Sequence, residues 1–270
     1  MPIYFDHLQR RVEIPSSPQR VASFVPSQTE LLFDLGLGNR LVGITRFCVH
    51  PKDKVESIPK IGGTKKLNLG RIRELKPHLI IANKEENNRE ELEVLEKEFP
   101  VWVSHISTWE DNLHFIQEMG RIFSIEDRAS QMIESLEEGW KKITPLDNLK
   151  TIYLIWKKPF MSVGGDTYIH ALLEKCGFQN LLAEEKRYPE VSLEKLQSLS
   201  PQVLILPSEP YPFGEKESKE LQEVLPQTSI FRVDGQLFCW YGSRLLHSFV
   251  DLRNLIEKIR KTVFQVKNLD

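Results

Sequence analysis

Two residues of this chain have the types and the spacing of a catalytic pair. Cys48 and His50 stand two positions apart in a segment rich in polar and aromatic residues. A thiol beside an imidazole can act as a nucleophile, because the imidazole accepts the thiol proton. A buried cysteine with no catalytic role is the more common explanation of such a pair. The pair therefore supports an enzyme only as an alternative.

Other catalytic and metal-binding patterns are missing from the sequence. The seven histidines show neither H-x-x-x-H nor H-E-x-x-H spacing, and Cys48, Cys176 and Cys239 form no C-x-x-C pair. There is no G-x-S-x-G and no G-x-x-x-x-G-K motif. The sequence therefore predicts no catalytic residue, no metal site and no catalytic cofactor.

Aromatic side chains are frequent in the segments that we expect to be loops. Their faces bury a large area at small entropic cost and stack on π systems, so this pattern favours a large flat ligand. Each ring could equally close the core of its own half of the chain. The residues are Phe47, Trp109, Trp156, Phe160, Tyr211, Phe213, Trp240 and Tyr241.

Polar groups in the same segments could hold an anionic part of a ligand. Pro26 and Ser27 precede a predicted helix, whose free N–H groups can bind an anion or a carbonyl, although Ser27 is more simply read as a helix cap. Arg46 and Arg244 can pair with phosphate or carboxylate. Solvated surface charge is the alternative for both arginines.

Composition and charge exclude several classes of protein. The chain has 270 residues, of which 40% are hydrophobic and 27% charged, and its net charge is -2. These values are typical of a globular protein and give no reason to expect nucleic acid or an anionic membrane as a partner. No apolar run has membrane-spanning length. The start lacks a signal-peptide pattern, which predicts a cytoplasmic protein as the sequence stands and a periplasmic one if the start is truncated.

Alternating strand and helix patterns predict an α/β fold with mainly parallel sheets. The predicted elements are a hairpin over 3–14, a strand over 20–25, a helix that begins with a Ser27–Glu30 capping box, a strand over 41–44, a helix over 69–75, a strand over 78–82, a charged helix over 88–99 and strands over 101–103 and 151–156, followed by a helix over 171–176.

A long helical pattern over 109–143 separates the two alternating halves. Its first part is predicted to be a separate helix that ends near Ser124. Its second part, 125–143, carries one apolar stripe, with Ser124 and Asp127 as its cap. A helix of about 20 residues is about 30 Å long and could brace two lobes.

The two halves also match each other in sequence. Residues 69–82 align with 193–206 without a gap, and a weaker match occurs earlier in each half. Chance agreement of common αβ units is the alternative. We predict a lobe over 1–108, a helical connector over 109–146 and a second lobe over 147–270. Because open parallel sheets bind ligands beyond the carboxyl ends of their strands, we expect a ligand cleft between the lobes.

The ordered series of motifs resembles the cobalamin- and ferric-siderophore-binding proteins of ABC importers, the helical-backbone metal receptor superfamily. The cobalamin-binding branch is the most similar. The resemblance covers nearly the whole chain and is carried by residues 10–45, 58–82, 162–182, 191–206 and 238–246. It implies two α/β lobes with mainly parallel sheets joined by one long backbone helix, as in class III periplasmic binding proteins, and it implies binding without catalysis.

The resemblance also implies a set of ligand contacts. A corrinoid would lie against aromatic and small polar loop residues, and we add Arg244 from the polar groups considered above. The predicted ligand-binding residues are Pro26, Ser27, Phe47, Thr64, Trp156, Phe160, Gly164, Gly165, Trp240, Tyr241 and Arg244.

Three departures from the family pattern affect this expectation. No export signal is present. The cobalamin branch can carry a tryptophan at the position of Thr64, so part of a stacking surface is absent. Family members dock on the permease through one acidic residue from each lobe, and the matching positions here are Gly70 and Cys239. Docking on an ABC permease would therefore lack its paired acidic contacts.

We therefore expect a non-catalytic protein that binds a corrinoid or a related metal chelate. A ferric-siderophore or haem-binding protein is the nearest alternative, because aromatic and arginine side chains suit those ligands too. An enzyme that uses Cys48 and His50 is the alternative from another class.

Overall fold

The computed structural model describes residues 1–266, with side chains described as far as Val263. The chain forms two compact units. Unit 1 comprises Met1–Ile106, Glu110–Leu136 and Tyr241–Arg244, and unit 2 comprises Ser107–Trp109, Glu137–Trp240 and the chain from Leu245 on. The predicted lobe boundaries at 108 and 146 stay a prediction.

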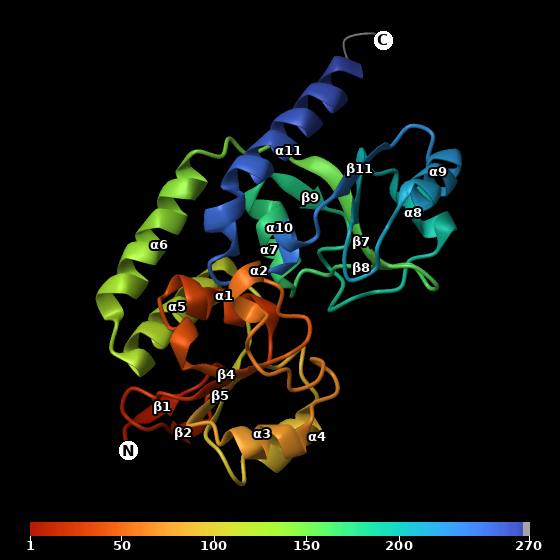
Figure 1. Ribbon diagram of the computed structural model, residues 1–270. Coiled ribbons are helices and arrows are strands. Elements are labelled where there is room, and N and C mark those ends of the chain that lie inside the picture. The colour runs from red at the N-terminus through yellow and green to blue at the C-terminus, as the bar shows by residue number, and fades with distance from the viewer. Residues whose placement is uncertain (267–270) are drawn as a thin grey trace. The chain divides into compact units, whose positions relative to one another are not determined.

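Unit 1 contains a sheet of four parallel strands in the order β4-β3-β5-β6 (Figure 1). These strands are β3 (Val21–Ser23), β4 (Leu41–Ile44), β5 (Leu79–Asn83) and β6 (Val101–Ser104), and a separate antiparallel hairpin consists of β1 (Ile3–Phe5) and β2 (Arg11–Glu13). The other elements that begin before residue 130 are α1 (Pro26–Asp34), the 3-10 helix η1 (Gly38–Arg40), α2 (Lys52–Val55), α3 (Leu69–Leu75), α4 (Arg89–Leu95), α5 (Trp109–Phe123) and α6 (Glu126–Lys141).

Both faces of this sheet are covered, as expected for parallel strands. On one face, Ile80 and Ala82 of β5 pack with Ile72 of α3. On the other, Trp102 of β6 stacks on Phe115 of α5 with ring centroids 5.6 Å apart. Every residue of β3, β5 and β6 is buried, which explains their continuous apolar runs in the sequence.

Unit 2 repeats the strand order of unit 1. Strand β7 pairs in parallel with β9 on one side and with β10 on the other, and β10 pairs with β11, so β9-β7-β10-β11 matches β4-β3-β5-β6. Its elements are β7 (Leu149–Trp156), the antiparallel β8 (Met161–Ser162), α7 (Tyr168–Lys175), β9 (Phe178–Asn180), α8 (Leu193–Leu199), β10 (Val203–Pro207), α9 (Glu215–Val224), β11 (Ser229–Val233) and α10 (Gln236–Cys239), and α11 (Arg244–Val266) ends the described chain.

Helices cover both faces of the second sheet as well (Figure 1). Ile152 and Leu204 pack with Leu196 of α8 on one face. Tyr153 faces the opposite side, where its ring lies 5.6 Å from that of Phe238 in α10. The predicted α/β fold with mainly parallel sheets is therefore confirmed.

The sequence repeat corresponds to a repeated structural segment. The segments α3–β5 and α8–β10 both consist of a seven-residue helix and a five-residue strand. Each helix has a side-chain cap, from Asn68 Oδ1 in one and Ser192 Oγ in the other. Each ends on a left-handed residue, Lys76 at φ 44° and Ser200 at φ 47°. We call these two segments the matched cassettes.

The predicted Ser27–Glu30 capping box is wrong. Helix α1 begins at Pro26, and its N-cap residue, Val25, makes no side-chain cap hydrogen bond. Proline has a fixed φ that suits the first helical position, so the helix starts one residue before Ser27. Ser27 then lies inside the first turn and is buried.

Ser124 ends one helix instead of capping the next. The predicted break is confirmed, because α5 ends at Phe123 and α6 starts at Glu126. Ser124 lies at φ 55°, and the N–H of Ile125 bonds to the carbonyl of Gly120 (2.9 Å). This is the left-handed helix ending in which the chain turns back on its last carbonyls.

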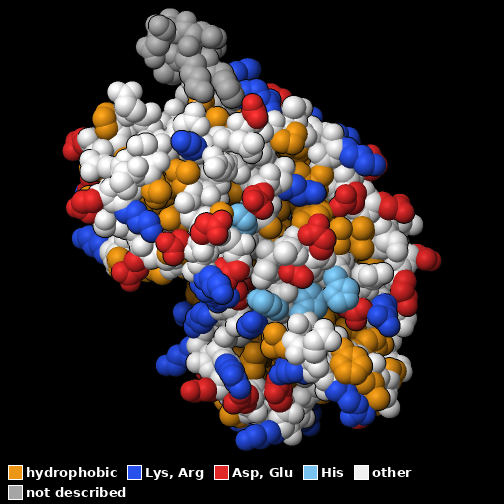
Figure 2. Space-filling model, turned by 180° about the vertical axis from the view of Figure 1, so that it is seen from behind, with side chains coloured by type: hydrophobic (Ala, Val, Ile, Leu, Met, Phe, Trp, Pro, Cys, Tyr) orange, Lys and Arg blue, Asp and Glu red, His pale blue; other side chains and the backbone are white. Residues whose placement is uncertain are grey.

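The N-terminal hairpin packs on the rest of unit 1 through a histidine. His7, in the hairpin loop, stacks on His114 of α5 at 5.0 Å, and its ring edge meets Trp102 at 5.1 Å. Its Nδ1 lies 2.9 Å from the carbonyl of His105. Histidine side chains gather on the face of the molecule drawn in Figure 2. Burial lowers the pKa of His7, and the nearby His114 lowers it further, while its bond to His105 opposes this.

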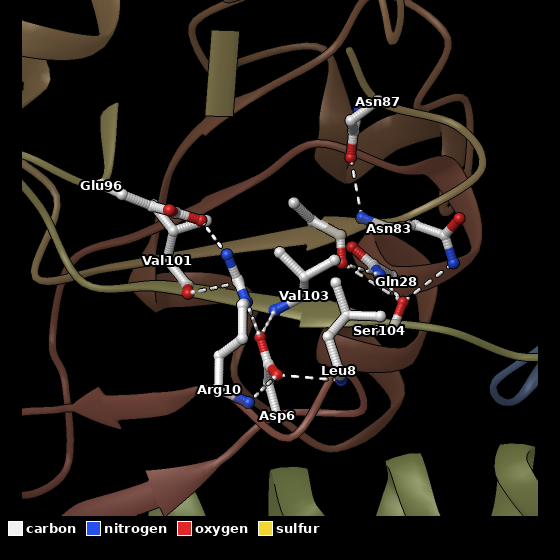
Figure 3. A network of polar contacts seen from close by, with 11 residues as sticks. Asp6, Leu8, Arg10, Gln28, Asn83, Asn87, Glu96, Val101, Val103 and Ser104 are labelled. Carbon is white, nitrogen blue, oxygen red and sulfur yellow. Dashed lines mark hydrogen bonds and ion pairs between the residues drawn. The ribbon is translucent and has the colours of Figure 1, made fainter. Parts of the chain in front are cut away.

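An ion-pair network holds the same hairpin (Figure 3). Asp6 is buried and accepts hydrogen bonds from the N–H groups of Leu8, Arg10 and Val103, at 2.9, 2.9 and 3.2 Å. The guanidinium of Arg10 pairs with Asp6 at 2.6 Å and also with Glu96. Hydrogen bonds and ion pairs to a charged group are stronger than those between neutral groups, so this network fixes the hairpin loop against β6.

Acid is expected to weaken the fold through His7. Its folded pKa lies below the ordinary value of 6.5, so the unfolded chain takes up the proton first as the pH falls. This contribution to stability is therefore complete above pH 6.5 and is lost as the pH falls through the folded pKa. A His7→Asn variant keeps a donor but cannot titrate, so its urea stability should fall less between pH 7 and pH 5. His78→Asn, at an exposed site, is the control, and equal slopes for all three proteins would contradict this account.

Candidate functional site

Buried polar side chains meet at the carboxyl ends of β5 and β6 in unit 1 (Figure 3). The hydroxyl of Ser104 accepts from Nε2 of Gln28 (2.8 Å) and from Nδ2 of Asn83 (2.9 Å), and it also lies 3.2 Å from the carbonyl of Ala82. Buried polar groups are costly unless they are hydrogen-bonded. The network therefore fixes the start of α1 against the strand ends. None of Gln28, Asn83 and Ser104 was assigned a role from the sequence.

A second bond ties a neighbouring turn to this edge. Asn87 accepts from the N–H of Asn83 at 2.8 Å and donates to the carbonyl of Thr64 at 3.0 Å. Thr64 is half-buried. The structure thus holds the backbone of Thr64 beside the strand ends, and a ligand contact from its side chain stays a prediction.

Tyr241 belongs to the same buried group. The side chain is 4% exposed, and burial raises its pKa well above the ordinary value, while Ser104, Ser27 and Gln28 oppose the rise. The structure therefore brings together two predicted site residues, Ser27 and Tyr241, as an internal brace of unit 1. Pro26, at the first position of α1, is half-buried beside them in sequence.

The loop after β4 is a tight turn that presents Phe47. The N–H of Cys48 bonds to the carbonyl of Thr45 (3.1 Å), so Arg46 and Phe47 occupy the two central positions. Both are exposed, Phe47 at 47%, whereas Thr45 and Cys48 are buried. Of the predicted aromatic contacts, Phe47 is one that is exposed to solvent.

The Cys48 thiol anchors this turn. Its Sγ lies 3.1 Å from Oγ1 of Thr29 and 3.3 Å from Oγ1 of Thr45, and it is 2% exposed. Burial raises the pKa of the Cys48 thiol, although both threonine hydroxyls oppose the rise. A reactive cysteine needs the opposite, a lowered pKa and access to solvent. The geometry therefore assigns the thiol a packing role and disfavours the Cys48–His50 enzyme.

Unit 2 carries an aromatic group at the end of β7. Trp156, the last residue of that strand, is 42% exposed and meets Tyr211 edge to face at 5.7 Å. Tyr211 in turn lies 4.7 Å from Phe213, which is buried. Phe160 is half-buried and packs against the core of the unit, where it borders a hollow of about 240 Å³. The most open aromatic surface in this group is therefore the ring of Trp156.

Close backbone packing requires glycine at both predicted positions, Gly164 and Gly165. A Cβ at Gly164 would lie 2.4 Å from the carbonyl oxygen of Glu185, and one at Gly165 would lie 2.1 Å from that of Ala183. Both distances are shorter than the van der Waals contact distance between a carbon and an oxygen atom. The two glycines thus allow the 183–187 segment to lie against the 162–165 segment, and the N–H groups of Gly164 and Gly165 donate to the carbonyls of Arg187 (2.8 Å) and Glu185 (3.0 Å).

Trp240 is an internal residue of unit 2. It is 7% exposed, and its Nε1 donates to Oε1 of Glu209 at 2.7 Å. The thiol of Cys239 reaches the same oxygen at 3.3 Å. Trp240 therefore braces the 208–213 loop, and direct contact of its ring with a ligand stays a prediction.

Arg244 forms a largely buried ion pair. Its guanidinium lies 3.1 Å from Glu30 of α1, with side-chain exposures of 12% and 4%. The predicted partner for Arg244 was an anionic ligand. The structure pairs this charge with Glu30, and a contact of Arg244 with an anionic ligand stays a prediction.

Known proteins resemble this chain in sequence. The sequence pattern of the family described as periplasmic binding protein matches residues 21–232. The chain belongs to this family. A vitamin B12-binding protein of Vibrio parahaemolyticus is 28% identical over 211 residues, which are 76% of this chain and 75% of that protein. An uncharacterized ABC transporter substrate-binding lipoprotein of Bacillus subtilis is 22% identical over 265 residues, 93% of this chain and 84% of that protein.

Solved structures agree with membership of the periplasmic binding protein family. The periplasmic vitamin B12-binding protein of Vibrio cholerae superposes with a TM-score of 0.74 at 20% identity, covering 92% of this chain and 100% of that one. A periplasmic haem-binding protein of Roseiflexus gives 0.75 at 19% identity, covering 89% and 98%. The predicted class III periplasmic-binding-protein fold is confirmed. The similarity to these proteins does not support the predicted cytoplasmic location.

The described residues of this periplasmic binding protein contain neither a metal-binding cluster nor a membrane-spanning helix. No group of three His, Cys, Asp or Glu side chains in that part of the chain could hold a metal ion. None of its described helices combines the length and the apolar character needed to cross a bilayer.

The buried thiols are expected to resist alkylation. Cys48 and Cys176 are buried, and burial raises the pKa of both, whereas Cys239 is half-buried. With iodoacetamide at pH 7.5, the native protein should be modified first at Cys239, and all three cysteines should react in urea. Peptide mass spectrometry measures the order. Faster reaction at Cys48 than at Cys239 would revive the enzyme interpretation.

Removing the charge of Arg244 is expected to unfold the protein more easily. An Arg244→Met variant leaves the carboxylate of Glu30 buried without its partner, which costs about 3 kcal/mol or more. Arg89→Met breaks an exposed pair with Glu93 and should cost less than about 0.5 kcal/mol. Urea unfolding measures both. Unchanged stability in Arg244→Met would mean that Arg244 acts only on a ligand.

Proposed function

We propose that this chain is a non-catalytic binding protein for a corrinoid or a related metal chelate. The observation that carries the proposal is an exposed aromatic ring at the carboxyl end of a parallel strand in each unit. Phe47 follows β4 at 47% exposure, and Trp156 ends β7 at 42%. An aromatic face in water is unfavourable, and a flat ligand that covers it recovers this free energy.

The choice of a corrinoid as the first candidate rests on the sequence relatives. The Vibrio parahaemolyticus protein that matches three quarters of this chain is named for vitamin B12. Haem is the second candidate, because a protein of closely similar fold is named for it and because the same rings can stack on a porphyrin. A ferric siderophore is the third.

Binding without chemical change fits the side chains at these loops. The Cys48 thiol is held between two threonine hydroxyls in a buried position. The polar groups at the strand ends, Gln28, Asn83 and Ser104, are engaged with one another. The proposal therefore gives these residues the task of shaping the loops, and the exposed rings the task of contacting the ligand.

Delivery of the bound ligand to an ABC importer is a separate proposal with its own test. Gly70 is exposed on α3, and Cys239 is half-buried and bonded to Glu209. Neither carries the acidic group that the family resemblance places there. Fractionation of cells that produce the native protein, followed by pull-down of membrane partners, would show whether it reaches a permease or works in the cytoplasm.

Equilibrium dialysis tests the ligand and the site together. The purified protein should bind one of cyanocobalamin, cobinamide, haemin and ferrichrome at a single saturable site. Trp156→Ala should weaken that binding about tenfold, because it removes a stacking face. Since Trp156 is partly exposed, the melting temperature of the Trp156→Ala variant should differ from that of the unmodified protein by less than about 3 °C. Val250→Ala, at another exposed apolar site in unit 2, is the matched control.

Each outcome of the dialysis has a clear meaning. Binding of haemin or ferrichrome alone would select the corresponding alternative ligand. Failure to bind any of the four would contradict the proposed function. Equal affinities for Trp156→Ala and the control would remove Trp156 from the site.

A further inference from the structure

We infer that unit 1 recognises an ionised carboxylate or phosphate group on the bound chelate, and that Arg46 is the residue that selects it. This inference rests on the proposed function and deepens it. It assigns a specificity-determining role to a residue outside the predicted contact set. It also names the class of ligand: a metal chelate that carries at least one free acidic group.

The first support is the way in which the chain presents Arg46. The residue occupies a central position of the Thr45–Cys48 turn, directly after the carboxyl end of β4. Its N–H bonds to the carbonyl of Gly62 at 2.9 Å, and the turn is anchored below by the buried Cys48. The backbone is therefore held firmly while the side chain is exposed. Ligands of open parallel sheets bind at this end of the strands.

The second support is the orientation of the guanidinium. The Cζ of Arg46 lies over the ring of Phe47, 5.0 Å from its centroid. A Cβ at Gly63 would come within 3.2 Å of the Phe47 ring and 3.5 Å of Nε and Nη2 of Arg46. A side chain at position 63 would thus crowd the stacked pair. The guanidinium lies over the ring of Phe47, with Gly63 beside both groups, and this stacking limits its rotamers before any ligand binds.

The third support is the balance of charge around the turn. Arg46 forms no ion pair with any residue in the described part of the chain, and neither does Lys66 of the adjacent turn. The ammonium of Lys65 bonds to the backbone carbonyl of Glu85. Of the acids on neighbouring elements, Glu85 lies near His105, and Glu91 accepts from the N–H of Leu67. The charge of Arg46 is consequently available to an anion.

The chemistry of the guanidinium defines the group that it would select. A planar guanidinium pairs with carboxylate or phosphate through parallel N–H bonds, and stacking leaves its edges free to do so. An amide or an ester offers a neutral oxygen, so the attraction between opposite charges and the bidentate pairing are lost. Arg46 should therefore favour the acid form of a chelate over its amidated or esterified form.

Two matched pairs of probes test the inference. One pair is cyanocobalamin and its monocarboxylic acids, in which one side-chain amide has become a carboxylate. The other is haemin and haemin dimethyl ester. Dialysis at about 0.05 M salt should show the acid member of a bound pair preferred about tenfold, and this preference should shrink at about 0.5 M salt.

Variants assign the preference to Arg46. Arg46→Gln should reduce the ratio of affinities, acid over neutral, by about tenfold, and Arg46→Lys should retain part of it because the charge remains. Arg71→Gln is the control, since Arg71 is an exposed arginine of unit 1 that pairs with Glu74. Equal affinity for both members of a pair, or the same ratio in Arg46→Gln as in the control, would overturn the inference while leaving the proposed function standing. No saturable binding of any probe would overturn both.

Discussion

A parallel pair of strands cannot be closed by a tight turn, and this constraint organises the whole chain. Each parallel strand of the two main sheets must be followed by a helix that returns the chain to the opposite end of the sheet before the next parallel strand begins. The parallel strands therefore all end at the same side of their sheet, and the loops that begin there collect in one region of each unit. Polar residues as distant in sequence as Gln28 and Ser104 meet for this reason.

The residues at these strand ends divide into two groups by their degree of burial. Ser27, Trp240 and Tyr241 are nearly inaccessible and bond or pack within their own unit. Phe47 and Trp156 leave nearly half of their surface in water. A family motif can contain both kinds, because evolution retains the residues that hold a loop as well as those that touch a ligand. Burial is therefore the property on which the proposed division of roles rests, since residue type alone does not distinguish them.

The elements that local pattern controls were predictable from the sequence. Strand β4 and helix α3 have the predicted limits, because apolar periodicity and flanking breakers act over a few residues. Ser27 was assigned wrongly for a local reason as well, since Pro26 fits the first position of a helix and displaces the serine from the cap.

Contacts between side chains far apart in the chain could not be predicted from the sequence. Nothing near Arg244 in the chain indicates that Glu30, more than two hundred positions away, takes its charge. The contact of Trp240 with Glu209 and the threonine hydroxyls around Cys48 are of the same kind. Their polar or aromatic character could be read directly, but which of them a fold would bury depends on partners that only the tertiary structure brings together.

The matched cassettes have a consequence for how such a protein diversifies. Helix, turn and strand agree in length and in the left-handed residue that joins them, so their ends define the same path for the chain. Genetic recombination between the two encoding segments would preserve the reading frame and the strand register together. A gene that encodes two such segments could exchange surface chemistry between its halves without an insertion or a deletion, so one architecture could change its surface in few steps.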